Sequence, residues 1–306
     1  MTEAAVAAIQ DATKPPGLRR RGLTAARLGG LVLALMFLAC VLSLPWSTPR
    51  YDAQELSEVL LAPGAEGGIM GTDRLGRSLA WRCALGGAIS LGIGLAAAAI
   101  AVCIGTTWGM VSGYAGGRVD AVMMRIVDVL YGLPYILLVV LLSVALEPAM
   151  VKALGQPLLA NIVTLLIAIG AVSWLTLARV VRGQVLSIKA QPFVEAARAT
   201  GLPPARILLR HILPNLIGPI IVYTTLTVPQ AILQESFLSF LGIGVQAPLP
   251  SWGNLAADGL SELNTVKSHP WLLAFPCTLL GVTLLALNFM GDGLRDYYDP
   301  RTLKAA

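Results

Sequence analysis

Charged side chains and prolines gather in one internal stretch, residues 195–214, which reads EAARATGLPPARILLRHILP. It holds one carboxylate, three arginines, a histidine and three prolines. The chain has only one other histidine, His269, and no HExxH, GxSxG or GxxxxGK[ST] pattern that would predict a metalloprotease, a hydrolase or a phosphate-binding loop. Its four cysteines show no CxxC spacing. We therefore expect no catalytic centre and no metal site on this chain.

The composition of the rest of the chain is that of a membrane protein. Hydrophobic residues make up 56% of 306 positions and charged residues only 13%, with a mean hydropathy of +0.74, whereas soluble domains carry about 25% charged residues. Lipid offers no hydrogen-bond partner to the backbone, and the alternation expected of a membrane barrel is absent. The sequence therefore predicts an all-α membrane protein. Six windows are long and apolar enough to cross a bilayer: 28–49, 83–117, 129–146, 153–178, 211–234 and 268–291.

The basic residues predict the orientation of these six spans. If both termini are cytoplasmic, 16 of the 22 lysines and arginines lie on the inner side, as the positive-inside rule requires. The net charge of +5 then needs no nucleic-acid partner, since aromatic residues do not interleave with the basic ones. The expected organisation is a cytoplasmic tail (1–27), a first transmembrane helix (28–49), an extracytoplasmic segment (50–82), a core of five helices (83–292) with an inner loop (187–215) and an outer loop (242–268), and a cytoplasmic C-terminal tail (293–306).

Two local patterns predict how parts of this core are built. Gly105, Gly109, Gly113 and Gly117 recur every four positions, which places them on one helix face where a neighbouring helix can approach closely. In the outer loop, prolines exclude a regular seventh span, and Ser251 is placed to cap a short helix.

Two carboxylates lie in or beside the apolar windows, and each has two interpretations. Asp128 stands near the inner surface. It can pair with a basic residue at the interface, or it can form part of an ion site. A charge costs about 3 kcal/mol at the bilayer centre. Glu235 stands near the outer end of the fifth span, where it either lines a solute path or caps a helix junction.

The opening stretch predicts two short helices at the inner surface. Pro192 suits a first helical turn and Gly201 a left-handed cap, so a helix should run from Pro192 to Ala199. A second amphipathic turn should begin at Pro203–Pro204 and end before Pro214. Such an element can lie on anionic lipid, or it can present Glu195 and small alanines to a groove in a cytoplasmic protein. The residues alone leave both interpretations open.

The run EAARATG followed by HILPN resembles the EAA loop of the membrane subunits of ATP-binding-cassette importers, the segment that docks into the ATPase subunit. His211 departs from it, standing where the family has an isoleucine. Three further motifs, GTDRLGR, SFLGIGVQAPLPSWG and LNFMGDGLRDYYDPR, resemble the C-type permeases of dipeptide and oligopeptide importers, with Ser78 in place of a frequent aspartate. The resemblance covers about residues 70–301 and implies that the coupling residues are Glu195, Ala196, Ala197, Arg198, Gly201, His211, Leu213 and Pro214.

The same resemblance implies a type I importer permease fold in a bacterial inner membrane, with no catalysis and no cofactor on this chain. ATP and Mg²⁺ would be held by two ATP-binding subunits. The other implied partners are a paralogous permease, an extracytoplasmic substrate-binding protein and the lipid bilayer, and the solute would be a dipeptide, an oligopeptide or a related small solute. A different class, an ion-coupled secondary transporter using Asp128 and Glu235, would work without these partners, and a purely structural or sensory subunit would show no flux.

Overall fold

The structure is a computed structural model, which describes residues 16–64, 68–263 and 268–298. The ends of the two expected tails and part of the outer loop lie outside these ranges. The described elements are α2 (Pro16–Arg50), η1 (Leu56–Glu58), α3 (Leu79–Ala115), α4 (Gly117–Tyr131), α5 (Tyr135–Leu154), α6 (Pro157–Lys189), α7 (Pro192–Ala199), α8 (Pro204–Ile207), η2 (Leu208–Ile212), α9 (Leu213–Phe240), α10 (Trp252–Ser261) and α11 (Trp271–Tyr298).

Six helical segments of the described chain are long and apolar enough to span a membrane, which confirms the predicted all-α fold and its six spans. Several helix ends differ from the windows: α2 starts within the expected amino-terminal tail, and α11 runs into the expected C-terminal one.

The third span differs most from its predicted window. We expected one crossing over 129–146, but the chain breaks between the end of α4 at Tyr131 and the start of α5 at Tyr135. Pro134 lacks the N–H that would continue the helix and disfavours the helical conformation in the residue before it, so Gly132 and Leu133 leave the helix. The crossing is therefore made by α5, with α4 as a separate helix before it.

Helices α3 and α6 form the centre of the bundle, in the most extensive helix pair of the described chain. A Cβ atom added at Gly105, Gly109 or Gly113 would meet α6 at 2.9 Å or less, so the predicted glycine face is confirmed for these three. Gly117 does not belong to it, because it begins α4 and has open space around it. The close approach of two backbones at this face is what the small residues permit.

We predict that Gly109→Ala destabilises the bundle while Gly92→Ala on the same helix does not. A Cβ at Gly109 would lie 2.6 Å from the carbonyl oxygen of Ala178 and 2.8 Å from Cβ of Val181, so α3 and α6 must separate, at a cost of about 1–3 kcal/mol. At Gly92 nothing lies within 4 Å, and alanine gains about 0.5–1 kcal/mol in helix propensity. Thermal unfolding of the purified protein in nanodiscs measures both; equal shifts would contradict the prediction.

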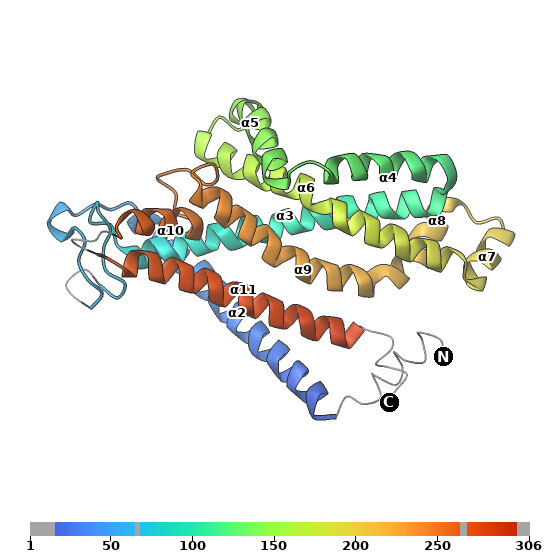
Figure 1. Ribbon diagram of the computed structural model, residues 1–306, viewed down its shortest axis with the longest axis horizontal. Coiled ribbons are helices and arrows are strands. Elements are labelled where there is room, and N and C mark those ends of the chain that lie inside the picture. The colour runs from blue at the N-terminus through green and yellow to red at the C-terminus, as the bar shows by residue number, and fades with distance from the viewer. Residues whose placement is uncertain (1–15, 65–67, 264–267, 299–306) are drawn as a thin grey trace.

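The loops predicted on opposite sides of the membrane lie at opposite ends of the bundle (Figure 1). One end carries α7 and α8, and the other carries α10 and the segment before α3. Helices α2 and α11 lie side by side and form a pair of their own. As predicted, Ser251 caps α10: its side chain accepts from the N–H of Asn254, and its own N–H donates to Oδ1 of Asn254.

Candidate functional site

Proline and glycine determine the ends of the short helix α7, as the sequence predicts. Pro192 occupies its first turn, where a missing N–H costs nothing. Gly201 is left-handed, with φ of +75°, and its N–H donates to the carbonyl of Arg198 at 2.9 Å, while the N–H of Leu202 donates to that of Ala197 at 3.2 Å. These two hydrogen bonds form a Schellman motif, which stops the helix at a fixed residue.

One face of α7 is anchored in the protein and the other is open. Val194 (0% exposed) and Ala197 (6%) pack with Val181 and Val185 of α6 in one hydrophobic cluster. On the open side, Glu195 and Ala196 are exposed, and Glu195 forms no ion pair with any residue that the structure describes. The helix therefore presents an unpaired carboxylate beside a small side chain, on an element that its buried face ties to α6.

A second link, which the sequence did not predict, ties α7 to the end of α3. The guanidinium of Arg198 lies 5.0 Å from the ring centre of Tyr114, a cation–π geometry. Lys189, the last residue of α6, donates to the backbone carbonyl of Tyr114. Tyr114 is thus held between α6 and α7. The contact joins positions far apart in the chain, so no local pattern signals it.

The second predicted helix does not end before Pro214. Residues 204–240 instead form one continuous helical path through α8, the wide π turn η2 and α9. Pro214 cannot donate to the carbonyl four residues before it, and π turns relieve such local misfits within a helix. His211 lies in this turn, half-buried, and its carbonyl accepts from the side chain of Asn215 at 2.7 Å. The coupling loop therefore continues directly into a membrane helix.

Two ion pairs fasten α4 to α6. Asp120 receives two hydrogen bonds from Arg182, at 3.0 and 2.6 Å, and a third from Ser112 of α3; the hydrogen bonds from Arg182 lower the pKa of Asp120 most. Asp128 pairs with Arg179 at 2.9 Å, and both side chains are partly exposed. The sequence singled out Asp128 but not Asp120, whose partner Arg182 lies on α6, 62 positions away.

Glu235 is fully buried in α9, with 0% of its surface exposed. It accepts hydrogen bonds from Ser239 at 2.8 Å and Ser236 at 3.2 Å, and the hydroxyl of Ser239 in turn accepts from the N–H of Val245 in the following loop. The neighbouring residue Gln234, and not Glu235, borders a cavity of about 580 Å³ between α5, α6 and α9. The contacts of Glu235 are thus those of a helix junction. Among the residues that the structure describes, Asp128 and Glu235 share no partner.

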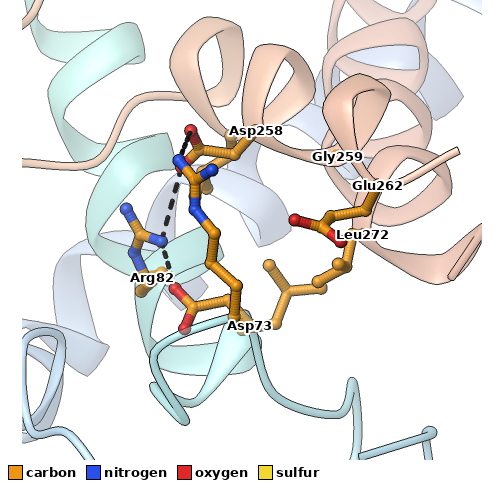
Figure 2. A pocket seen from close by; sticks show the side chains of 9 residues that line it. Asp73, Arg82, Asp258, Gly259, Glu262 and Leu272 are labelled. Atoms are coloured by element: carbon orange, nitrogen blue, oxygen red, sulfur yellow. Dashed lines mark hydrogen bonds and ion pairs between the residues drawn. The ribbon is translucent and has the colours of Figure 1, made fainter. Parts of the chain in front are cut away.

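The GTDRLGR motif folds into a buried charge cluster at the other end of the bundle. Asp73 accepts from the side chains of both Arg77 and Arg82 and from the backbone N–H of Leu75 and Arg77. Burial raises the pKa of Asp73, but the two arginines and the N–H donors outweigh it and hold the pKa below its usual value. Figure 2 shows Arg82 between Asp73 and Asp258, which joins the segment to α10. The space they enclose, about 10 Å³, holds no more than a water, so the cluster is structural.

Ser78, the departure within this motif, precedes α3 and makes no side-chain capping hydrogen bond. Its side chain therefore adds nothing to the charge cluster among the described residues.

Comparison with known proteins agrees with this architecture. The model of the family "Binding-protein-dependent transport system inner membrane component" matches residues 105–304. The oligopeptide transport system permease protein OppC of Haemophilus influenzae is 45% identical over 90% of this chain and 85% of its own. OppC of Escherichia coli K12 is 47% identical over 89% of this chain and 85% of its own. The dipeptide transport system permease protein DppC of Bacillus subtilis is 44% identical over 90% of this chain and 82% of its own.

The fold also resembles a solved structure. A chain of the MetNI methionine ABC transporter, crystallised in an inward-facing conformation, superposes with a TM-score of 0.55 at 19% identity, covering 72% of this chain and 97% of its own. At this identity the likeness supports the fold alone.

Proposed function

Because this chain belongs to the family of binding-protein-dependent transport system inner membrane components, we propose that it forms, with a paralogous permease, the path by which dipeptides, oligopeptides or a related small solute enter the cell. A subunit of this family is a multi-pass inner-membrane protein without enzymatic activity that works with an ATPase and a substrate-binding protein. The observation that carries the choice of solute is the 44–47% identity to peptide permeases over about 90% of the chain.

In this proposal, α7 is the element that binds the ATPase subunits. Its exposed carboxylate, Glu195, and its exposed small residue, Ala196, form the docking face. The buried side chains of Val194 and Ala197 carry its displacement to α6. The continuous path from α8 through η2 to α9 carries it into the membrane. ATP and Mg²⁺ are bound by the two ATPase subunits, and this chain supplies no ligand to them.

The ion-coupled carrier is a weaker alternative. Its two carboxylates sit in unrelated surroundings, Asp128 paired with Arg179 at an exposed site and Glu235 enclosed by serines. A proton or ion relay between them would need a shared site, which the described residues do not form.

Glu195→Lys tests the proposal. The variant places a positive charge where the groove of the ATPase subunit meets the carboxylate of Glu195. Mismatched charges across an interface cost several kcal/mol. We expect ATP-driven uptake of a radiolabelled tripeptide by proteoliposomes containing the whole complex to fall by about tenfold or more, with the chain still inserted.

Glu55→Lys is the matched control, because it makes the same charge change at an exposed residue of the segment before α3, at the opposite end of the bundle. Its uptake rate should equal that of the unmodified complex. Equal rates in both variants would overturn the role of α7, whereas failure of the unmodified complex to take up any peptide would overturn the choice of solute.

A further inference from the structure

A cavity of about 580 Å³ opens beside the break between α4 and α5, and α6 and α9 line its other sides. This volume lies within the range typical of small-molecule sites. None of the residues around it is charged, and six are polar or phenolic: Tyr131, Tyr135, Ser173, Thr176, Gln230 and Gln234.

The polar residues of α6 and α9 come from one face of each helix. Ser173 is the middle residue of the 33-residue helix α6, about 24 Å from either end, and Thr176 follows one turn later on the same face. Gln230 and Gln234 are four positions apart on α9. Ser173 and Thr176 lie within the apolar window 153–178, near its inner end, and Gln230 and Gln234 lie within the window 211–234. Hydroxyls and amides that face lipid there are costly, so they indicate a face turned to water or to a solute.

The backbone break between α4 and α5 also borders this cavity. Residues 132–134 between α4 and α5 are not helical and are exposed, at the start of the crossing that α5 makes. Here, Leu133 and both tyrosines that flank the break border the cavity.

The hydrogen-bonding groups of the cavity are partly organised and partly free. The hydroxyl of Tyr135 donates to Oε1 of Gln234 and lies 3.2 Å from Oγ of Ser173, so α5, α6 and α9 meet at one phenol. Among the described residues, Nε2 of Gln234 and the side chains of Gln230 and Thr176 have no hydrogen-bond partner. Free amide donors and acceptors thus face the space.

We propose that this cavity is the solute-contacting site of this subunit and that it takes a neutral, amide-bearing segment of the solute, such as the backbone of a peptide. Amide and hydroxyl groups match peptide N–H and C=O groups, and the leucines and valine between them accept apolar side chains of varied shape. The absence of charge from the lining disfavours an inorganic ion or a phosphorylated solute. The inference rests on the proposed function and adds the site and the chemistry of recognition.

The test uses Gln234→Leu and Gln230→Leu in the complete complex, with a labelled tripeptide and its depsipeptide analogue, in which an ester replaces one of the two backbone amides. Losing one or two neutral hydrogen bonds should lower the initial uptake rate of the tripeptide by about 2–10-fold per residue. The depsipeptide lacks the N–H of the replaced amide. The two variants should therefore transport it at nearly the rate at which the unmodified complex transports it. Leu141→Gln, an exposed position of α5 that does not border the cavity, is the control.

A thiol-labelling experiment separates a solute site from a surface covered by another chain. In a complex whose native cysteines are replaced, Thr176→Cys should react with a water-soluble thiosulfonate, because the thiolate forms only in contact with water, and excess tripeptide should slow the reaction. Leu141→Cys should not react.

An unreactive Thr176→Cys would overturn the inference, since the paired permease would then fill the cavity. So would equal tripeptide uptake by the glutamine variants and the unmodified complex. A complex that transports no peptide at all would instead overturn the proposed function.

Discussion

Gly201→Pro should reduce ATP-driven peptide uptake to background while the chain still inserts into the membrane. Gly201 adopts φ of +75°, whereas proline is held near −65°, and its N–H donates to the carbonyl of Arg198. Proline removes both the conformation and the donor, so the C-terminal turn of α7 must unwind and Arg198 must leave the ring of Tyr114. Insertion is preserved because residue 201 lies outside the six spans. Uptake and ATP hydrolysis by the reconstituted complex measure the effect together.

Gly201→Asn and Gly201→Ala provide the graded controls. A Cβ atom at this position meets nothing within 4 Å, so the two variants differ only in the backbone conformation they allow. Asparagine visits the left-handed region readily, while other residues pay about 1–2 kcal/mol there. Uptake should therefore fall in the order asparagine, alanine, proline. Unchanged uptake in the proline variant would show that the end of α7 does not take part in coupling.

The parts of this structure that the sequence predicts are those that local chemistry decides. Six apolar windows indicate six helices, because backbone N–H and C=O groups in lipid must form their hydrogen bonds within the segment. Pro192 and Gly201 mark the two ends of α7, and Ser251 the start of α10, since each acts on hydrogen bonds within a few residues of itself.

The errors occurred where a local signal met a competing one. The apolar run over 129–146 predicts a continuous span, but Pro134 within this run breaks the helix between α4 and α5. Pro214 predicts the end of a helix, but the helical path continues through it by way of a π turn, where the side chain of Asn215 donates to the carbonyl of His211.

The contacts between distant positions could not be predicted from one sequence. Arg198 meets Tyr114, Arg182 meets Asp120, and Tyr135 meets Gln234 across 99 positions. Each pair depends on how helices are placed relative to one another, and nothing in the residue types at either end selects the partner. Both the link from α7 to α3 and the polar cavity therefore emerge only from the fold.

Asp73→Asn should destabilise the protein far more than Asp52→Asn, although both carboxylates bind Arg77. The side chain of Asp73 is 6% exposed and also binds Arg82, whose side chain is 4% exposed, while that of Asp52 is 41% exposed. Removing one partner of a buried ion pair costs about 3–5 kcal/mol, because the remaining charge is left uncompensated. An exposed pair contributes about 0–1 kcal/mol. Denaturant unfolding of the purified protein in micelles gives both free energies.

The pH dependence distinguishes the charge of Asp73 from its shape. Because the pKa of Asp73 is lowered in the folded protein, its stabilising contribution is present above the ordinary aspartate value of about 3.9 and is lost as the pH falls through the lower folded value. The gap in unfolding free energy between the unmodified protein and Asp73→Asn should therefore be constant near neutral pH and narrow below about pH 4. A gap that persists unchanged into acid, or equal losses in the two variants, would show that packing and not the buried charge holds the segment before α3 in place.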